Sequence, residues 1–467
     1  MGLIRTLPVA IGAALALLGC EVGCDGERVP PQAPRPPTPS ALGDAGAGGR
    51  IDDRGAMPGF LDAPPGTLDR LFERLAAAER KEPGARVGVI VFGDSHTAGD
   101  SMTSRLRVAW QARFGDAGRG LVAAGRPSAK HYYQRDVRYG ASGSWKAAVG
   151  GKSGDVEPFG IVGLRVFGEK KGSQLWVETC ADCQAGTTVA QFEILYQAGP
   201  DQGILRYRVD DSAWQQLATK TAPIEPPHPA RHVIPVLTGP HKLTLEHGGG
   251  GRLDLYGVGL ETLQPGVIVD SLGVVGRRLG SLRSWDWSII GEQLATRDPR
   301  LVVLQYGTNE ADDPDLDLEA IAKYYDETIL RIRAAAPTAS ILILGPPDMG
   351  VREGGRACDR MKPKDGVVVA ECEWRTPAVL TELIAVQHAA AARNKVAFFD
   401  TFSAMGGPDR MHGWVTAEPR GAFKDHVHFT DGGYQIWADA LSGALLAEYD
   451  RWKKTSPRSP TPERARP

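Results

Sequence analysis

The stretch from Val87 to Asp100, Val-Gly-Val-Ile-Val-Phe-Gly-Asp-Ser-His-Thr-Ala-Gly-Asp, decides the fold class of this chain. Its apolar run, Val87 to Phe92, has the length of a buried strand and ends at a Gly-led turn that carries Ser95. Apolar residues at helical spacing follow from Met102 to Arg113, so the stretch predicts a strand–turn–helix unit of an α/β fold. Reactive groups in open α/β sheets lie at the carboxyl ends of strands, which is where Ser95 is placed. The N–H groups at the start of the helix would favour an oxyanion that develops near this serine.

Strands and helices alternate again after residue 263, whereas the middle of the chain has a different character. The strands of the α/β parts are near-continuous apolar runs, as a parallel sheet covered on both faces requires. Between 141 and 263, short alternating runs separated by Gly, Pro and Asp indicate a β-sandwich. We therefore assign residues 66–140 and 264–453 to one three-layer α/β/α domain, and residues 141–263 to an insert. After the insert we expect strands at 267–269, 300–305, 340–344 and 396–399, and helices at 318–335, 377–393 and 432–449.

The composition indicates a globular chain without a nucleic-acid partner. Of its 467 residues 42% are hydrophobic, which is ample for packed cores. Its 54 basic and 56 acidic residues give a net charge of −2, and no dense basic block occurs outside the short tail. Residues 20–65 are rich in Pro and Gly and predict a flexible linker, and residues 454–467 predict a disordered tail. We expect a monomer.

Residues 1–19 are typical of an export signal. Arg5 precedes an apolar run at 7–18 that is too short to be a good membrane span. The run ends in Gly19-Cys20, which resembles the bacterial lipobox, in which the cysteine is lipidated. Lipidation at Cys20 would tether the protein to a membrane surface without crossing it. The alternative is a conventional signal peptide that is cleaved nearby.

Export implies an oxidising compartment, where cysteines can pair. Two local disulfides are consistent with the spacing, Cys180 with Cys183 and Cys358 with Cys372. A zinc site needs four ligands of the Cys or His type, and the chain offers one tight Cys pair with no matching second pair. This spacing therefore argues against a zinc site, and we expect no metal ion and no cofactor.

A serine nucleophile needs a base, a partner that orients the base, and donors for the oxyanion. Asp425 and His428 lie three residues apart just before the last helix, so one loop can present a carboxylate–imidazole pair to Ser95. Asn309 follows a predicted strand of the sheet. Its amide, the Ser95 N–H and a glycine N–H near Gly276 are therefore candidate oxyanion donors.

The same residues also have a purely structural interpretation. Asp94 and Ser95 can simply cap the helix that follows them, and the loop at 424–431 can be an ordinary polar loop. His426 and the remaining histidines are predicted to be solvated or structural.

The motifs resemble, in order, the four blocks of the SGNH (GDSL-like) hydrolases. The resemblance covers about 70–140 and 265–450 and implies a flavodoxin-like fold. It also implies that Ser95 is the nucleophile, His428 the base and Asp425 its partner. Gly276 and Asn309 would complete the oxyanion hole, with Gly273 as the alternative glycine. The chain departs from the family pattern at His96, where Leu is usual, and at Glu310, where Asp is common. The matching segments are Gly93-Asp94-Ser95, Gly273 to Gly276, Gly307-Thr308-Asn309 and Asp425-x-x-His428.

The first two blocks look most like those of the bacterial peptidoglycan O-acetylesterases, which carry a carbohydrate-binding-module-like jelly-roll domain between these blocks. The resemblance implies an exported, lipid-anchored esterase of the cell envelope that removes acetyl or other small acyl groups from glycan, above all peptidoglycan. Acyl transfer to a glycan would use the same residues. A glycan-binding insert on an inactive hydrolase scaffold is the non-enzymatic alternative. Candidates for stacking on sugar rings in the insert are Trp145, Trp176, Trp214 and Tyr256.

Overall fold

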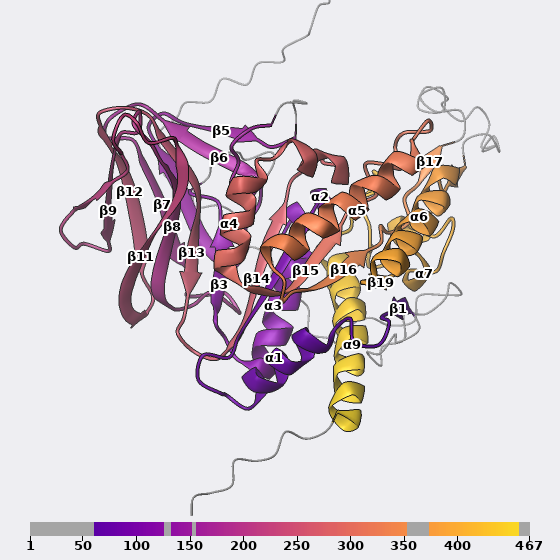
Figure 1. Ribbon diagram of the computed structural model, residues 1–467. Coiled ribbons are helices and arrows are strands. Elements are labelled where there is room, and N and C mark those ends of the chain that lie inside the picture. Colours follow the sequence, from indigo (N-terminus) through magenta and orange to yellow (C-terminus); the bar gives the residue numbers. More distant parts are fainter. Residues whose placement is uncertain (1–59, 126–131, 152–155, 353–372, 457–467) are drawn as a thin grey trace, which may run out of the picture. The chain divides into compact units, whose positions relative to one another are not determined.

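The computed structural model describes residues 60–125, 132–151, 156–352 and 373–456 (Figure 1). A six-stranded sheet forms the centre of the α/β domain, in the order β1-β19-β16-β15-β2-β14. Neighbouring strands are parallel except at the edge, where β1 pairs antiparallel with β19. The strands are β1 (Leu61–Asp62), β2 (Arg86–Gly93), β14 (Gly266–Gly273), β15 (Pro299–Gln305), β16 (Ser340–Leu344) and β19 (Ala397–Phe399).

The order of the parallel strands confirms the flavodoxin-like arrangement. Numbered along the chain, the five parallel strands lie in the order 2-1-3-4-5, which is a doubly wound sheet. Ligands bind to such sheets at the point where the strand order reverses, and here that point lies between β2 and β15. Because Ser95 follows β2 and Asn309 follows β15, both residues lie at this point of the sheet edge.

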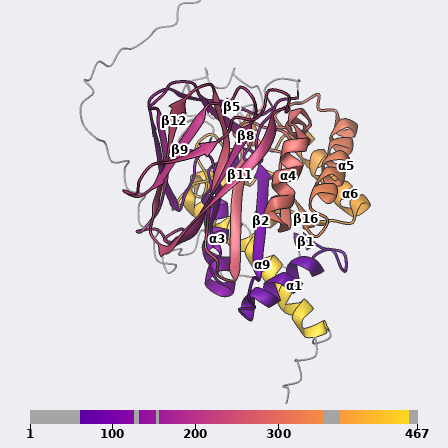
Figure 2. The same ribbon diagram turned by 60° about the vertical axis from the view of Figure 1, so that its left-hand side comes forward.

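Helices cover both faces of the sheet (Figures 1 and 2). The β2 residues Val87, Val89 and Val91 pack with side chains of α1, α3 and α9. Ile90 and Phe92 of the same strand pack with side chains of α4, α5 and α6. Successive side chains of a strand point to opposite faces, so β2 is buried on both sides. The helices are α1 (Asp69–Glu79), α3 (Ser101–Phe114), α4 (Trp287–Arg297), α5 (Leu318–Ala335), α6 (Ala378–Asn394) and α9 (Asp431–Thr455). Shorter elements are α2 (Ser95–Ala98), the 3-10 helix η3 (Leu279–Ser284), α7 (Thr401–Ala404), α8 (Met411–Thr416), β17 (Val351–Arg352) and β18 (Trp374–Arg375).

Two antiparallel sheets form the inserted β domain. One has the order β10-β9-β12-β7-β4, and the other has the order β11-β8-β13-β6-β5, with β3 also paired to β13. Side chains of both sheets share one core, which includes Leu243 from the first sheet and Phe192 from the second. The short alternating runs therefore correctly predict antiparallel sheets. The strands are β3 (Gly118–Val122), β4 (Val137–Ser142), β5 (Trp145–Val149), β6 (Leu164–Gly168), β7 (Gln174–Thr179), β8 (Val189–Ala198), β9 (Ile204–Val209), β10 (Gln215–Ala218), β11 (His228–Gly239), β12 (Lys242–Gly249) and β13 (Leu253–Glu261).

The borders of these domains differ in places from the predicted ones. The β domain takes β3 from the segment 66–140, and β4 already begins at Val137. Strand β1 lies inside the predicted linker 20–65, and α9 continues to Thr455, inside the predicted tail 454–467. The Gly-rich β3 has no alternating pattern, and its partner β13 is far away in sequence, so the pairing cannot be read locally. None of the helices within the described ranges is both long and apolar enough to cross a membrane.

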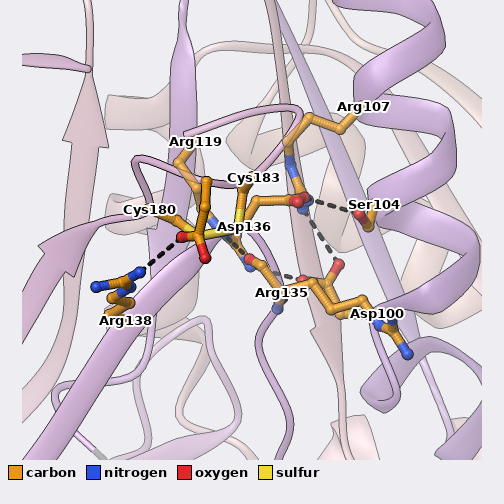
Figure 3. Close-up of a disulfide and its surroundings, with 10 residues drawn as sticks. Asp100, Ser104, Arg107, Arg119, Arg135, Asp136, Arg138, Cys180 and Cys183 are labelled. Atoms are coloured by element: carbon orange, nitrogen blue, oxygen red, sulfur yellow. Dashed lines mark hydrogen bonds and ion pairs between the residues drawn. A yellow bond between two sulfur atoms is a disulfide. The ribbon is translucent and has the colours of Figure 1, made fainter. Parts of the chain in front are cut away.

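Buried ion pairs join the β domain to the helix that follows Ser95 (Figure 3). Arg107 of α3 contacts Asp100 at 3.2 Å and Asp136 at 2.5 Å, and Arg119 contacts Asp100 at 2.6 Å. These four side chains are at most 9% exposed. Arg119 lies in β3 and Asp136 directly precedes β4. The network therefore links the helix beyond the nucleophile motif to two strands of the β domain.

Candidate active site

Ser95 begins the short helix α2, immediately after the end of β2. The carboxylate of Asp94 caps this helix by accepting a hydrogen bond from the His96 N–H at 2.9 Å. A Cβ at Gly93 would clash with the Thr97 side chain, so glycine is required for the close approach of strand and helix. The capping interpretation is therefore correct for Asp94, and it leaves the Ser95 hydroxyl available to another partner.

Hydrogen bonds connect Ser95 to the loop that precedes α9. His428 Nε2 lies 2.8 Å from Ser95 Oγ, although the two residues are 333 positions apart in the chain. His428 Nδ1 lies 2.8 Å from Asp425 Oδ2. The other oxygen of Asp425 accepts hydrogen bonds from the N–H groups of Val427 and His428, each at 3.0 Å. The spacing of three residues thus lets the carboxylate fix both the loop and the imidazole.

The protonation of this pair suits the removal of a proton from serine. The hydrogen bond to Asp425 raises the pKa of His428 above its ordinary value near 6.5. Burial raises the pKa of Asp425, but hydrogen bonds from the His428 ring and from two main-chain N–H groups outweigh burial and lower it to about 2. Asp425 is therefore charged at neutral pH, and its negative charge can stabilise a protonated imidazole at His428.

Asn309 lies on the turn that follows β15, where its amide Nδ2 donates a hydrogen bond to the Arg277 carbonyl at 3.1 Å. The neighbouring Glu310 is buried and accepts hydrogen bonds from the N–H groups of Leu279 at 2.7 Å and Gly307 at 3.1 Å. Burial raises the pKa of Glu310 to about 6. The Glu310 side chain therefore joins the Asn309 turn to the start of η3, and glutamate at this position, where Asp is common, has a structural role.

The two candidate oxyanion glycines have different surroundings. Gly273 ends β14 and is buried against α2, where a Cβ would clash with the main chain of Thr97 and Ala98. Gly276 is exposed and has a φ of 72°, and an added Cβ would meet no atom within 4 Å. Only Gly276 has open space beside its main chain, so it stays the better candidate for contact with a ligand.

His96 is a buried neighbour of the triad whose contacts the sequence does not predict. Its Nδ1 lies 3.0 Å from the Tyr434 hydroxyl, and its ring packs against Phe429 and Trp437. The ring centroids of His96 and His428 are 5.3 Å apart. Burial lowers the pKa of His96 to about 3, so the ring is neutral. Histidine at this position therefore fills an aromatic pocket and also bonds to a hydroxyl, which Leu could not do.

His426 stabilises the loop that carries the Asp–His pair. The residue is buried, has a φ of 57°, and stacks on Trp374 with the ring centroids 3.4 Å apart. Its Nδ1 lies 3.0 Å from the Lys424 carbonyl oxygen, and its Nε2 lies 2.9 Å from His412 Nδ1. These contacts give His426 a structural role, which is one of the two roles that the sequence suggests for it.

The structure tests the predictions for only some of the cysteines. Cys180 and Cys183 form a disulfide after β7 (Figure 3). Cys20, Cys358 and Cys372 lie outside the described residues, so the lipidation and the second disulfide stay predictions.

The four aromatic candidates of the insert are not equally accessible. Tyr256 is buried, so it cannot stack on a sugar at the surface. Trp145, Trp176 and Trp214 are half-buried. Cations already lie over two of these rings. Lys242 is 4.5 Å from the ring centroid of Trp176, and two arginines are within 4.9 Å of that of Trp214.

Comparison with known proteins connects this site to a family. The GDSL-like Lipase/Acylhydrolase family matches residues 246–436, which include Asn309, Asp425 and His428. None of the curated proteins matches the chain. A solved peptidoglycan O-acetylesterase has 23% identity and a TM-score of 0.66 over 84% of this chain and 99% of its own, which shows a shared fold.

Two solved family two carbohydrate esterases are more distant. The protein from Cellvibrio japonicus is 11% identical over 67% of this chain and 98% of its own, with a TM-score of 0.26. The protein from Clostridium thermocellum, in complex with cellohexaose, is 12% identical over 65% of this chain and 99% of its own, again with a TM-score of 0.26. The family match covers the segment with the Asn, Asp and His residues and the sheet has the doubly wound order, so this part of the chain is similar to the GDSL-like (SGNH) lipases and acylhydrolases.

Proposed function

We propose that the chain is an exported serine esterase that removes acetyl or other small acyl groups from cell-wall glycan. The observation that carries the proposal is the pair of 2.8 Å contacts that connect Ser95 Oγ through His428 to Asp425. The side chains of His428 and Asp425 are 37% and 48% exposed, so a polymer can reach the site from solvent. The fold shared with a peptidoglycan O-acetylesterase favours an acylated glycan as the substrate.

Acylation of the enzyme begins when His428 Nε2 takes the proton of the Ser95 hydroxyl. Ser95 Oγ forms a bond to the ester carbonyl carbon, and the carbonyl electron pair moves to the oxygen. The N–H groups of Ser95 and Gly276 and the Asn309 amide stabilise this oxyanion. Collapse of the intermediate breaks the bond to the sugar oxygen, which receives the proton from His428.

Water then releases the acyl group. His428 removes a proton from the water molecule that attacks the acyl-serine carbonyl, and returns that proton to Ser95 Oγ as the carboxylic acid leaves. Asp425 stays ionised and stabilises the imidazolium in both halves of the cycle. The proposed reaction needs no group beyond the side chains, the main chain and water.

The test compares Ser95→Ala with Ser101→Ala, whose hydroxyl donates to Asp431 at 3.0 Å. Acetate release is measured from 4-nitrophenyl acetate and from O-acetylated peptidoglycan, after thermal unfolding has shown that both variants fold. Ser95→Ala should lose at least about 10³-fold in kcat, and Ser101→Ala should keep its activity. Retained turnover by Ser95→Ala would contradict the proposal.

The same assay separates the alternatives. Formation of newly acetylated glycan in place of free acetate would indicate acyl transfer through the same residues. Binding of peptidoglycan by the wild-type chain, without turnover of any ester, would indicate a glycan-binding protein on an inactive scaffold.

We also propose that a lipid on Cys20 holds the exported protein at a membrane surface in the cell envelope. Support comes from the lipobox-like sequence alone. Cys20→Ala should abolish incorporation of a labelled fatty acid and move the protein from the membrane fraction to the soluble fraction. Cys24→Ala is the matched control and should change neither. Unchanged labelling of Cys20→Ala would contradict this anchor.

A further inference from the structure

One hydroxyl group connects the residue after Ser95 to the residue after His428. The Tyr434 hydroxyl lies 3.0 Å from Nδ1 of His96, which directly follows Ser95. The main-chain N–H of Phe429, which directly follows His428, also forms a hydrogen bond with this hydroxyl. Because a hydroxyl both donates and accepts, it can serve both partners at once. Tyr434 therefore joins the short helix that presents Ser95 to the loop that presents His428.

This connection is buried. His96, Phe429 and Tyr434 are 0%, 2% and 6% exposed. The ring of Phe429 packs against that of His96 with the centroids 5.9 Å apart, and against that of Tyr434 with the centroids 5.5 Å apart. A hydrogen bond is electrostatically stronger in such surroundings than in water. The three side chains thus form one packed unit next to the catalytic imidazole.

His96 keeps its charge state while the neighbouring imidazole changes its own. Burial, together with the charge of His428, lowers the pKa of His96 to about 3. His96 is therefore neutral throughout the proposed catalytic cycle, in which His428 gains and loses a proton. The bond between His96 and Tyr434 consequently does not have to change from one step of the reaction to the next.

Among the described residues, two side-chain hydrogen bonds connect α2 with the segment 420–437. One joins Ser95 to His428, and the other joins His96 to Tyr434. The reaction breaks the first of these bonds. In the acyl-enzyme, Ser95 Oγ is bonded to the acyl carbon and has no proton, so it cannot donate to His428. The bond between His96 and Tyr434 is then the one that remains.

We propose that Tyr434 is a positioning residue that keeps His428 within reach of the acyl-serine while the acyl-enzyme is hydrolysed. The inference rests on the proposed esterase function and adds to it a residue that acts through His428. Hydrolysis requires this imidazole to remove a proton from the attacking water, so a small displacement of the ring slows the step. Acylation depends less on Tyr434, because the Ser95 hydroxyl is still bonded to His428 at that stage.

The test uses Tyr434→Phe, which removes the hydroxyl and keeps the ring. Tyr449→Phe is the matched control, because Tyr449 is buried on the same helix and loses a comparable bond, from its hydroxyl to Glu79 at 2.8 Å. It lies about 22 Å further along the helix at the rise of an α-helix. Stopped-flow release of 4-nitrophenolate from 4-nitrophenyl acetate separates the burst, which reports acylation, from the steady rate of acyl-enzyme hydrolysis.

Tyr434→Phe should show a burst, with a burst rate within about twofold of the wild-type rate and a steady rate about tenfold lower. Because kcat/KM contains only the steps up to acylation, kcat and KM should fall together and their ratio should stay within about twofold. Tyr449→Phe should change neither rate. A purely structural role of Tyr434 would lower the burst amplitude, since fewer molecules are folded, and would leave both rates of the folded molecules unchanged.

A double variant separates positioning from stability. Tyr434→Phe leaves buried His96 Nδ1 without its partner, whereas Tyr434→Phe combined with His96→Leu replaces both partners with apolar groups, which costs less stability. The double variant should therefore unfold at a higher temperature than Tyr434→Phe but hydrolyse its acyl-enzyme equally slowly. Recovery of the hydrolysis rate together with stability would overturn the inference.

The failure of this inference differs from the failure of the esterase proposal. Normal steady turnover by Tyr434→Phe, an equal fall in its burst and steady rates, or the absence of a burst would overturn the role of Tyr434 and leave the esterase intact. A wild-type chain that releases no 4-nitrophenolate would instead overturn the esterase proposal, and the role of Tyr434 with it.

Discussion

The side-chain amide of Asn309 donates a hydrogen bond to the main-chain carbonyl of Arg277 at 3.1 Å. This contact fixes which way the amide faces and leaves its second N–H available for an oxyanion. The Arg277 side chain in turn donates to the carbonyl of Gly150, just after β5 of the β domain, at 2.5 Å. The proposed oxyanion donors are therefore held by contacts with both domains.

Asn309→Ala tests the oxyanion role directly. The variant should lose about 10²- to 10³-fold in kcat on 4-nitrophenyl acetate with little change in KM, because the amide acts on charge that develops only in the transition state. Asn394→Ala, at the end of α6, is the control and should be fully active. A loss of less than threefold for Asn309→Ala would remove this residue from the mechanism.

Arg277→Met tests whether the β domain positions the oxyanion loop. Loss of the bond to Gly150 should lower kcat on the same small ester by about 10- to 100-fold, since small displacements at a catalytic site have effects of this size. If Arg277 acts through Asn309, the double variant should be no slower than Asn309→Ala. Arg300→Met, whose guanidinium pairs with Asp298 at 2.7 Å, is the control. Additive losses in the double variant would indicate that Arg277 acts independently of Asn309.

The pH dependence of kcat/KM should follow the ionisation of His428. His428 accepts the serine proton only when neutral, so activity should rise with pH through a pKa above the ordinary 6.5, because Asp425 raises it. Asp425→Asn removes the negative charge, so the acidic limb of its residual activity should move to lower pH, with kcat reduced about 10⁴-fold. A limb that stays in place or moves to higher pH in Asp425→Asn would contradict this assignment.

Arg107→Met tests the buried network behind the site. The substitution removes the arginine that pairs with Asp136 and one of the two buried arginines that pair with Asp100, so urea unfolding should show a loss of about 3 to 5 kcal/mol. Arg105→Met, on the same helix, breaks an exposed pair with Asp439 at 2.7 Å and should cost about 1 kcal/mol or less. Equal losses in the two variants would show that burial does not determine how much these ion pairs contribute to the free energy of unfolding.

Much of the α/β domain could be predicted because its elements have strong local signals. The amphipathic pattern at 318–335 gives α5 with its observed bounds, and the apolar run at 340–344 does the same for β16. Helix α4 is not among the helices expected from the sequence. Its local start signal is Asp286, whose carboxylate accepts a hydrogen bond from the Ser288 N–H. The helical pattern that follows this capping residue is short and is interrupted by Gly291, so the pattern does not predict a helix on its own.

The site could be predicted only in part, for a physical reason. Ser95, Asp425 and His428 could be named from local motifs and from the resemblance to a family, and the structure brings them together. The role of Arg277 depends on a contact with the main chain of a different domain, which has no sequence signature. The burial of His96 depends in the same way on rings contributed by distant parts of the chain.

The most direct measurement of the central claim is mass spectrometry of the chain quenched during turnover of an acetyl ester. A 4-nitrophenyl ester is used, because its good leaving group makes acylation of Ser95 faster than hydrolysis of the acyl-enzyme, so that the acyl-enzyme accumulates and can be trapped. The account predicts one added acetyl group on the peptide that contains Ser95, and none on the same peptide of Ser95→Ala. Steady turnover with no acetyl group on that peptide, or an acetyl group on a different residue, would contradict it.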